Sequence, residues 1–229
     1  MRYVSFSGGA DSTALAILLH ERGQEIELVF ADTGAELPET YWIIPRVARL
    51  LGVPLHIVSN GTFFQHLAEP QGQLKRLPWC IPGHHVRWCT KELKVKVLPK
   101  QIAVGIRADE KDRMPDFDRP LVDAGLGKRD VLNLCASRGL LNPIYEWRSN
   151  CSCFCCPFQR KHDWLNMLDR HPDLYALAED WEENAKLMGC HTRITWNAGY
   201  SLRQLREADE AQMALMPECR EEACAICQW

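Results

Sequence analysis

Residues 2–13 read RYVSFSGGADST, and this stretch decides how the chain begins to fold. Residues 2–6 predict a short buried strand, and residues 11–22 predict a helix whose apolar side chains recur at helical spacing. Between them, Gly8 and Gly9 allow the backbone to approach a ligand closely. The unpaired N–H groups at a helix start attract anions. The stretch therefore predicts a phosphate-binding turn, with an ordinary capped turn as the alternative.

The same alternation of strand and helix continues along the chain. Residues 26–31 and 55–58 predict two further strands, and residues 39–51 predict a helix between them. This spacing favours βαβ units, so we expect an α/β fold with a Rossmann-like parallel sheet flanked by helices. Further along, we expect a strand at 101–106, loop-rich segments at 62–83 and 108–129, and helices at 90–98, 130–138, 160–170 and 172–188.

The domain organisation that we expect is simple. Residues 1–150 would form the nucleotide-binding α/β part, and residues 151–229 a small Cys-rich helical part of the same domain. The composition is 46% hydrophobic and 25% charged, which excludes wholesale disorder. No apolar run approaches the roughly 18 residues of a membrane-spanning helix, and no apolar leader opens the chain. We therefore expect a cytoplasmic protein without a membrane partner.

Charge and cysteine content narrow the class of ligand. The formal net charge is -3, but seven basic residues against the single acid Glu92 lie between Lys75 and Lys100. This stretch suits an anionic ligand, or is a solvated helix face. Eleven cysteines are present without an export signal, which argues against a disulfide framework and favours metal, iron–sulfur or redox chemistry.

Four segments, in the same order along the chain, resemble one protein family. Ser7 to Thr13 resembles the SGGxDS pyrophosphate loop of the N-type ATP pyrophosphatase (PP-loop) superfamily. The other three resemble its phosphoadenosine phosphosulfate (PAPS) reductase branch. They are Asp32-Thr33-Gly34 with Glu39-Thr40, Gly105-Ile106-Arg107 with Arg113, and Asn142-Pro143-Ile144 with Trp147.

The resemblance implies an adenine nucleotide, ATP or a PAPS-like nucleotide, at the carboxyl edge of the sheet. Ligands of open α/β sheets bind at this edge. By motif, the phosphate end would be held by Ser7, Gly8, Gly9, Asp11, Ser12 and Thr13, and the nucleoside by Asp32, Thr33 and Gly34. Gly105 and Arg107 would complete the pocket, with an ion pair to Asp109 as the alternative for Arg107. Ser7, Asp11, Ser12 and Arg107 are the predicted catalytic residues, and Mg²⁺ would accompany the phosphates.

The cysteines depart from the family pattern. Cys153 and Cys156 have the spacing at which two thiolates bind one metal centre, and Cys89 is the predicted third ligand. The fourth ligand is Cys80, Cys151 or Cys190, and a [4Fe–4S] cluster, zinc or free thiols remain open. This variant resembles divergent members of phages, mobile elements and phosphorothioation- or CRISPR-associated gene sets. A family member ends in Glu-Cys-Gly-x-His, whereas this chain ends in PECREEACAICQW.

Three functions follow as hypotheses. The first is an ATP α–β pyrophosphatase that adenylylates an acceptor for sulfur or other group transfer. The second is reduction of PAPS or adenosine phosphosulfate, with Cys219 as nucleophile. The third is a non-catalytic nucleotide-binding subunit of a CRISPR-type nucleic-acid-processing complex, docking through residues 75–100, where Trp79 and Trp88 either stack on a base or pack in the core. A homodimer is left open.

Overall fold

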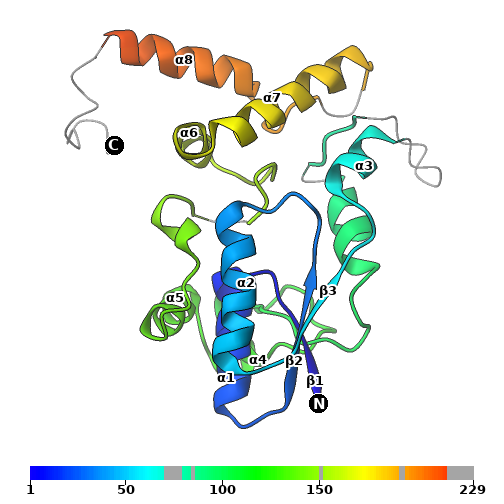
Figure 1. The fold of residues 1–229 in the computed structure, drawn as a ribbon, viewed down its shortest axis with the longest axis vertical. Coiled ribbons are helices and arrows are strands. Elements are labelled where there is room, and N and C mark those ends of the chain that lie inside the picture. The colour runs from blue at the N-terminus through cyan, green and yellow to red at the C-terminus, as the bar shows by residue number, and fades with distance from the viewer. Residues whose placement is uncertain (70–78, 84–85, 150–151, 191–193, 216–229) are drawn as a thin grey trace.

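A computed structural model describes residues 1–69, 79–83, 86–149, 152–190 and 194–215 (Figure 1). Its named strands form a parallel sheet in the order β1-β2-β3, with β1 at Arg2–Ser5, β2 at Ile26–Ala31 and β3 at Leu55–Val58. Helices α1 (Ala10–Glu21) and α2 (Pro38–Leu51) make the two crossovers. The βαβ pattern read from the sequence is therefore confirmed.

The segment 101–106 was predicted as a strand, but in the structure only Ala103 pairs with β1. Ala103 lies beside β1, where its N–H donates to the Tyr3 carbonyl at 2.9 Å and its carbonyl accepts from Ser5 N–H at 2.9 Å. The chain then turns, because the Ile106 N–H donates to the Val104 carbonyl at 2.9 Å. That local bond takes the backbone away from the sheet and toward the start of α1.

The remaining elements are short or helical. They are α3 (Phe63–Ala68), a π-helix (Thr90–Val95), a 3₁₀ turn (Ala108–Glu110), α4 (Pro120–Asp123), α5 (Lys128–Ser137), a 3₁₀ turn (Pro143–Glu146), α6 (Lys161–Arg170), α7 (Pro172–Leu187) and α8 (Leu202–Leu215). Helix α3 falls in a predicted loop, where Thr62 and Gln65 form a capping box. The segment 108–129, also predicted as loop, contains α4, whose Leu121 is fully buried.

The two faces of the sheet pack against two different sets of apolar side chains. Leu28 and Phe30 of β2 belong to the core formed with α1, α2 and α5. Val29 points the other way and packs with Ile102 and Val104. Alternate strand residues point to opposite faces, so a strand buried on both sides reads as a continuous apolar run.

A second core is rich in aromatic side chains. Phe63 packs against Trp88, Trp181 and Trp196, with ring centroids 4.9, 5.5 and 6.1 Å away, and Trp164 joins through Trp196 at 6.3 Å. Trp88 is 2% exposed, so it packs in the core and is not available to stack on a base. In Figure 1 the strands run upward from the N-terminus, and α6, α7 and α8 lie beyond their carboxyl ends.

One disulfide ties this aromatic core together. Cys80 is bonded to Cys190, 110 residues away in sequence, with Cα atoms 5.6 Å apart. The sequence argued against a disulfide framework, and this single bond is not one. Cys80 and Cys190 were two of the three candidates for the fourth metal ligand, and in this structure their sulfur atoms are bonded to each other instead. Only the packing of the 79–83 segment against the end of α7 brings the two thiols within bonding distance.

Candidate active site

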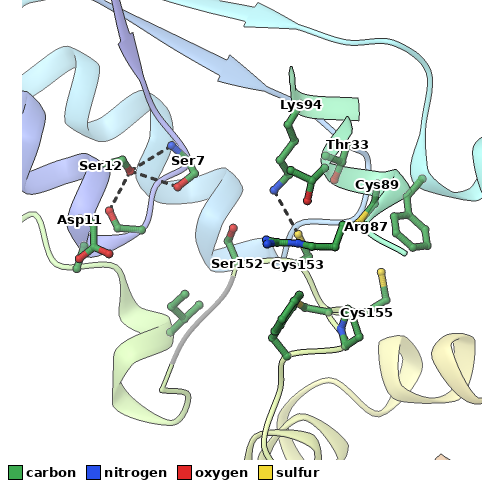
Figure 2. A pocket seen from close by; sticks show the side chains of 18 of the residues that line it. Ser7, Asp11, Ser12, Thr33, Arg87, Cys89, Lys94, Ser152, Cys153 and Cys155 are labelled. Carbon is green, nitrogen blue, oxygen red and sulfur yellow. Dashed lines mark hydrogen bonds between the residues drawn. The ribbon is translucent and has the colours of Figure 1, made fainter. Parts of the chain in front are cut away.

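The turn between β1 and α1 is held in shape by hydrogen bonds within the turn and by one from Asn142. Gly8 has φ +70°, a conformation that L side chains rarely adopt, and its carbonyl accepts from Asn142 Nδ2 at 2.9 Å. Ser12 Oγ donates to the Gly9 carbonyl at 3.1 Å and accepts from the Ser7 N–H at 3.2 Å. The Ser7 and Ser12 hydroxyls therefore lie together at the N-terminal end of α1, as Figure 2 shows.

Two side chains from further along the chain, those of Tyr145 and Cys135, form hydrogen bonds with Ala10 in the first turn of α1. The Ala10 N–H donates to the Tyr145 hydroxyl at 2.9 Å, so Tyr145 occupies a backbone donor that would otherwise face a bound anion. The Cys135 thiol donates to the Ala10 carbonyl at 3.3 Å. Thr13, predicted to contact phosphate, is 1% exposed and does not line the cavity described below.

Gly105 and Arg107 support the turn from the side. A Cβ atom at Gly105 would lie 2.8 Å from the carbonyl carbon of Asp11 and 2.9 Å from the Ser12 nitrogen. Only glycine permits this approach between two backbones. Arg107 Nη1 lies 2.6 Å from Asp11 Oδ2, and the same guanidinium bonds Asp109 at 3.0 Å.

These contacts shift the pKa values of Asp11 and Arg107 from their usual values. Burial raises the pKa of Asp11 above its usual value, while Arg107 opposes the rise. Burial works to lower the pKa of Arg107, but its hydrogen bonds to Asp109 and Asp11 outweigh this effect and raise it. The ion pair with Asp109 named from the sequence is thus present, together with a second pair that holds Arg107 against α1.

Of the three residues predicted to contact the nucleoside, Thr33 lines the cavity. Asp32 accepts from the Tyr41 hydroxyl at 2.8 Å and from the Gly34 N–H at 2.9 Å, so its carboxylate shapes the turn after β2. Gly34 packs against Thr62, 3.1 Å from where a Cβ would stand. Asp32 and Gly34 thus shape the turn after β2, and their contact with a nucleoside stays a prediction.

The Cys-rich segment pairs with the chain just after β2. Leu37 N–H donates to the Ser152 carbonyl at 2.8 Å, and Phe154 N–H donates to the Ala35 carbonyl at 2.9 Å. This antiparallel pairing places Cys153 opposite Glu36. Residues far apart in sequence are thereby brought to the edge of the sheet where the phosphate turn lies.

A lysine lies between the thiols and a buried acid. Lys94 Nζ, from the π-helix, is 3.7 Å from Cys153 Sγ and 3.7 Å from Glu36 Oε1 (Figure 2). The charge of Cys153 raises the pKa of Lys94, with a smaller contribution from Glu36. Burial raises the pKa of the Cys89 thiol and raises that of the Cys155 thiol well above its usual value.

The predicted metal ligands share one wall but are not assembled into a site. Cys89, Cys153 and Cys156 line the same cavity. Within the described residues, no group of three or more His, Cys, Asp and Glu side chains is close enough together to hold a metal ion. Cys151, the remaining candidate for the fourth ligand, and the tail cysteines Cys219, Cys224 and Cys227 lie outside those residues.

One cavity of about 450 Å³ joins the phosphate turn to the thiols. Its lining includes Ser7, Gly9, Asp11 and Ser12 on one side and Cys89, Cys153, Cys155 and Cys156 on the other, with the cationic side chains of Arg87, Lys94, Arg107 and Arg113 against the acids Asp11 and Glu110. The excess of cationic groups suits an anionic ligand. A neighbouring cavity of about 440 Å³ is lined mainly by apolar side chains at the ends of β1 and β2.

Comparison with known proteins places this arrangement in a family. The phosphoadenosine phosphosulfate reductase domain family matches residues 2–150, more than half of the chain. The chain belongs to this family. The part of the chain that matches the family model contains the sheet, the turn between β1 and α1, Arg107 and the 3₁₀ turn that includes Tyr145.

Several relatives and structures resemble the chain in part. An uncharacterized protein of Methanocaldococcus jannaschii is 34% identical over 43% of this chain and 19% of its own length. An uncharacterized nin region protein of Escherichia phage lambda is 29% identical over 48% of this chain and 49% of its own length. The chain thus spans less than half the length of these two relatives.

Two solved structures are similar to the chain at low identity, each with a TM-score below 0.5. A phosphoadenylyl-sulfate reductase from Candida auris, in a phosphate complex, has TM-score 0.44 and 15% identity, covering 66% of this chain and 80% of that chain. The U34-tRNA thiolase NcsA from Methanococcus maripaludis, with its [4Fe-4S] cluster, has TM-score 0.39 and 18% identity, covering 80% of this chain and 72% of that chain.

Sequence reasoning did not assign several residues that line the cavity. Arg87 and Lys94 were read only as part of the cationic stretch, although the structure turns both toward the thiols. Lys96 of the same stretch is paired with Glu92, and Lys75 lies outside the described residues. The stretch is therefore divided between the cavity and the surface. None of the described helices is long and apolar enough to cross a membrane.

Proposed function

We propose that this chain binds ATP and cleaves it between the α- and β-phosphates, adenylylating an acceptor. The observation that carries the proposal is the single cavity in which the phosphate turn faces Arg107, Lys94 and the thiols. A ligand that spans this cavity must present negative charge to the turn and a reacting group to the cysteines. ATP with an activated acceptor meets both requirements.

The adenine ring fits the neighbouring apolar cavity, which shares Ser7, Thr90 and Lys94 with the first. Phe30 and Ala31 at the end of β2, together with Val104, supply its apolar walls. Flat apolar walls suit a purine. The triphosphate would then extend from this cavity over Ser7 toward the start of α1.

The reaction balances as two displacements. An acceptor oxygen attacks the α-phosphorus, the bond from that phosphorus to the bridging oxygen breaks, and pyrophosphate leaves with the electron pair. A sulfur nucleophile or another group then attacks the acceptor carbon, and AMP leaves with the former acceptor oxygen. Ser7, Ser12 and the α1 amides that follow Ala10 would stabilise phosphate charge, and Arg107 and Arg113 would neutralise it. Asp11 and Glu110, the acids of the cavity lining, would hold the Mg²⁺ that accompanies the phosphates and neutralises their charge.

The thiols Cys89, Cys153 and Cys156 are proposed as ligands of a metal centre. Their donor chemistry fits a [4Fe–4S] cluster or zinc, both of which accept thiolates, although the described side chains must approach one another to close around a metal. Bound there, a cluster would supply sulfur-handling or redox chemistry. The reaction above does not depend on it.

The decisive experiment is incubation of anaerobically purified protein with ATP labelled at the α- or the γ-phosphate. Formation of AMP and pyrophosphate supports the proposal. Formation of ADP and phosphate contradicts it, as does calorimetry that detects no ATP binding. Because the acceptor has to be supplied, the assay is run with thiols, nucleosides and nucleic acids in separate reactions.

Reduction of a sulfonucleotide is the second candidate, favoured by the family to which the chain belongs. Its nucleophile would be Cys219, which lies outside the described residues. Sulfite release from PAPS or adenosine phosphosulfate, with a thioredoxin-type thiol as reductant, tests it directly. Sulfite released by the intact chain and lost in Cys219→Ser would replace the first proposal by the second.

A further inference from the structure

The exposed face of α2 combines an aromatic ring with two arginines. Trp42 is 54% exposed, and the Arg46 guanidinium lies over its ring, 5.1 Å from the centroid. Arg49 follows one turn later, and these side chains with Pro45 line a surface hollow of about 230 Å³. Leu50 nearby is 57% exposed. An exposed ring and an aliphatic side chain beside two guanidinium groups offer contacts to a ligand that carries both apolar and anionic groups.

The charges of this face are not balanced by neighbouring acids. Among the residues that the structure describes, neither Arg46 nor Arg49 has an ion-pair partner. Helix α2 contains one acid, Glu39, whose carboxylate is bonded to His171 at 2.9 Å. Glu39 lies on the same stripe of the helix as Trp42, at i and i+3. The stripe therefore presents two available guanidinium groups beside a flat ring.

The opposite face of α2 makes the surface rigid. Ile43, Ile44 and Val47 are at most 2% exposed and belong to the first core. Fixed side chains lose little conformational entropy when a ligand orders them. The buried face thus fixes the backbone of α2, from which Trp42, Arg46 and Arg49 extend.

We propose that this face of α2 binds single-stranded nucleic acid. An unpaired base would stack on Trp42 in place of the Arg46 guanidinium, and Arg46, once displaced from the ring, and Arg49 would hold the flanking phosphates. Guanidinium groups match phosphate geometry, and base stacking on aromatic rings requires bases that are not already stacked in a duplex. A protein partner with an acidic apolar helix is the competing occupant, and a surface built for it would leave the single strands in the test below unbound.

The position of the surface connects it to the cavity. Leu37, at the start of α2, is bonded to Ser152, which lines the cavity. Trp42 is five residues further on, about 8 Å along the helix axis. A strand held on α2 would therefore lie close to the proposed site of ATP cleavage. The proposal does not rest on that activity, because binding is measured without ATP.

The test is fluorescence anisotropy with a labelled RNA oligonucleotide of mixed sequence, the DNA oligonucleotide of the same sequence, and its duplex. Single strands of either sugar should bind, and the duplex should bind more weakly. Trp42→Ala should weaken binding about tenfold or more, and Trp42→Phe should retain most of it. Arg46→Gln with Arg49→Gln should reduce the slope of log K against log salt by about 1.4, at ~0.7 for each phosphate contact.

The matched control is Arg22→Gln with Arg129→Gln, two exposed arginines on α1's end and on α5. This pair removes the same charge from other faces and should leave the affinity within about twofold of the wild-type protein. The proposal is overturned if the wild-type chain binds no single strand, if it binds duplex equally well, or if the control pair loses as much affinity as the α2 pair. Circular dichroism and ATP calorimetry on each variant show that the fold is intact.

Discussion

Arg107 forms an ion pair with Asp11, and its Nη1 lies 2.6 Å from the carboxylate Oδ2. The two residues are 96 positions apart in sequence. Their ion pair fixes the first turn of α1 against the segment that leaves the sheet at Gly105. The phosphate turn is therefore held from both ends, by its own serines and by a distant arginine.

Removing a side chain from the turn tests the proposed ATP site. Ser12→Ala should reduce the rate of pyrophosphate release by about 10²–10³-fold, the cost typical of losing one donor to transition-state charge. Asp11→Ala should also reduce it, because it removes the carboxylate that holds Arg107 against α1. Asp123→Ala and Ser137→Ala make the same changes at surface positions and should retain full activity. Unchanged turnover in both turn variants would remove this turn from the mechanism.

Gly105 tests the close approach of two backbones. Gly105→Ala would place a Cβ 2.8 Å from the Asp11 backbone, so we expect the free energy of unfolding to fall by about 1–3 kcal/mol and ATP affinity to fall with it. Gly199→Ala, where the nearest atom is 3.6 Å away, is the control. Urea denaturation and calorimetry measure the two effects. A stable variant with unaltered ATP affinity would show that the turn tolerates displacement.

Glu182 predicts a pH dependence of stability. Its carboxylate accepts from Trp196 N–H at 2.8 Å and Leu202 N–H at 2.6 Å. Burial raises its pKa from 4.5 to about 7, although both hydrogen bonds oppose the rise. The folded state therefore binds the proton more tightly than the unfolded state does. The stabilisation from this group is fully present below about pH 4.5 and is lost as the pH rises to about 7.

Replacing the carboxyl group removes this dependence. Between about pH 5 and about pH 8, the free energy of unfolding of Glu182→Gln should rise relative to that of the wild-type protein, by up to about 3 kcal/mol. Glu207→Gln, at an exposed position of α8, should show no such change. Equal pH profiles for wild-type and Glu182→Gln protein would mean that Glu182 is ionised in the folded state.

The disulfide is tested by differential alkylation. Without reductant, Cys80 and Cys190 should resist iodoacetamide under denaturing conditions, and both should react after reduction. Closing a loop of this length stabilises a fold by about 4 to 5 kcal/mol, so reduction should lower the melting temperature. Mass spectrometry of the peptides gives the answer. Alkylation of both residues before reduction would show that the thiols are not joined.

The metal centre is tested by elemental analysis under anaerobic conditions. We expect iron or zinc in the purified protein, and the visible absorption of an iron–sulfur cluster distinguishes the two. Cys89→Ala and Cys153→Ala should each lose most of the bound metal. Cys135→Ala, which alters a buried thiol near Ala10 and away from the cavity lining, should keep it. Metal content that is equal in all three variants would refute the assignment of Cys89 and Cys153.

Some features of the fold were readable from local pattern. Strands 26–31 and 55–58 match β2 and β3 residue for residue, because continuous apolar runs between turn residues leave few alternatives. Helix α8 was not predicted, and it is held against α7 by buried Leu202 and Leu205 and by Glu179 of α7, which bonds Arg203 and Arg206. No local pattern announces an ion pair between two helices.

The sequence by itself determined the strand-turn-helix unit at the start of the chain, the parallel sheet and the family. These features depend on glycines, on apolar periodicity and on the order of short motifs. The tertiary structure alone decided which side chains meet: Lys94 with Cys153, Cys80 with Cys190, and Arg107 with Asp11. Each of these pairs joins segments more than 50 residues apart. Long-range contacts of this kind follow from packing of whole elements, which no short stretch of sequence encodes.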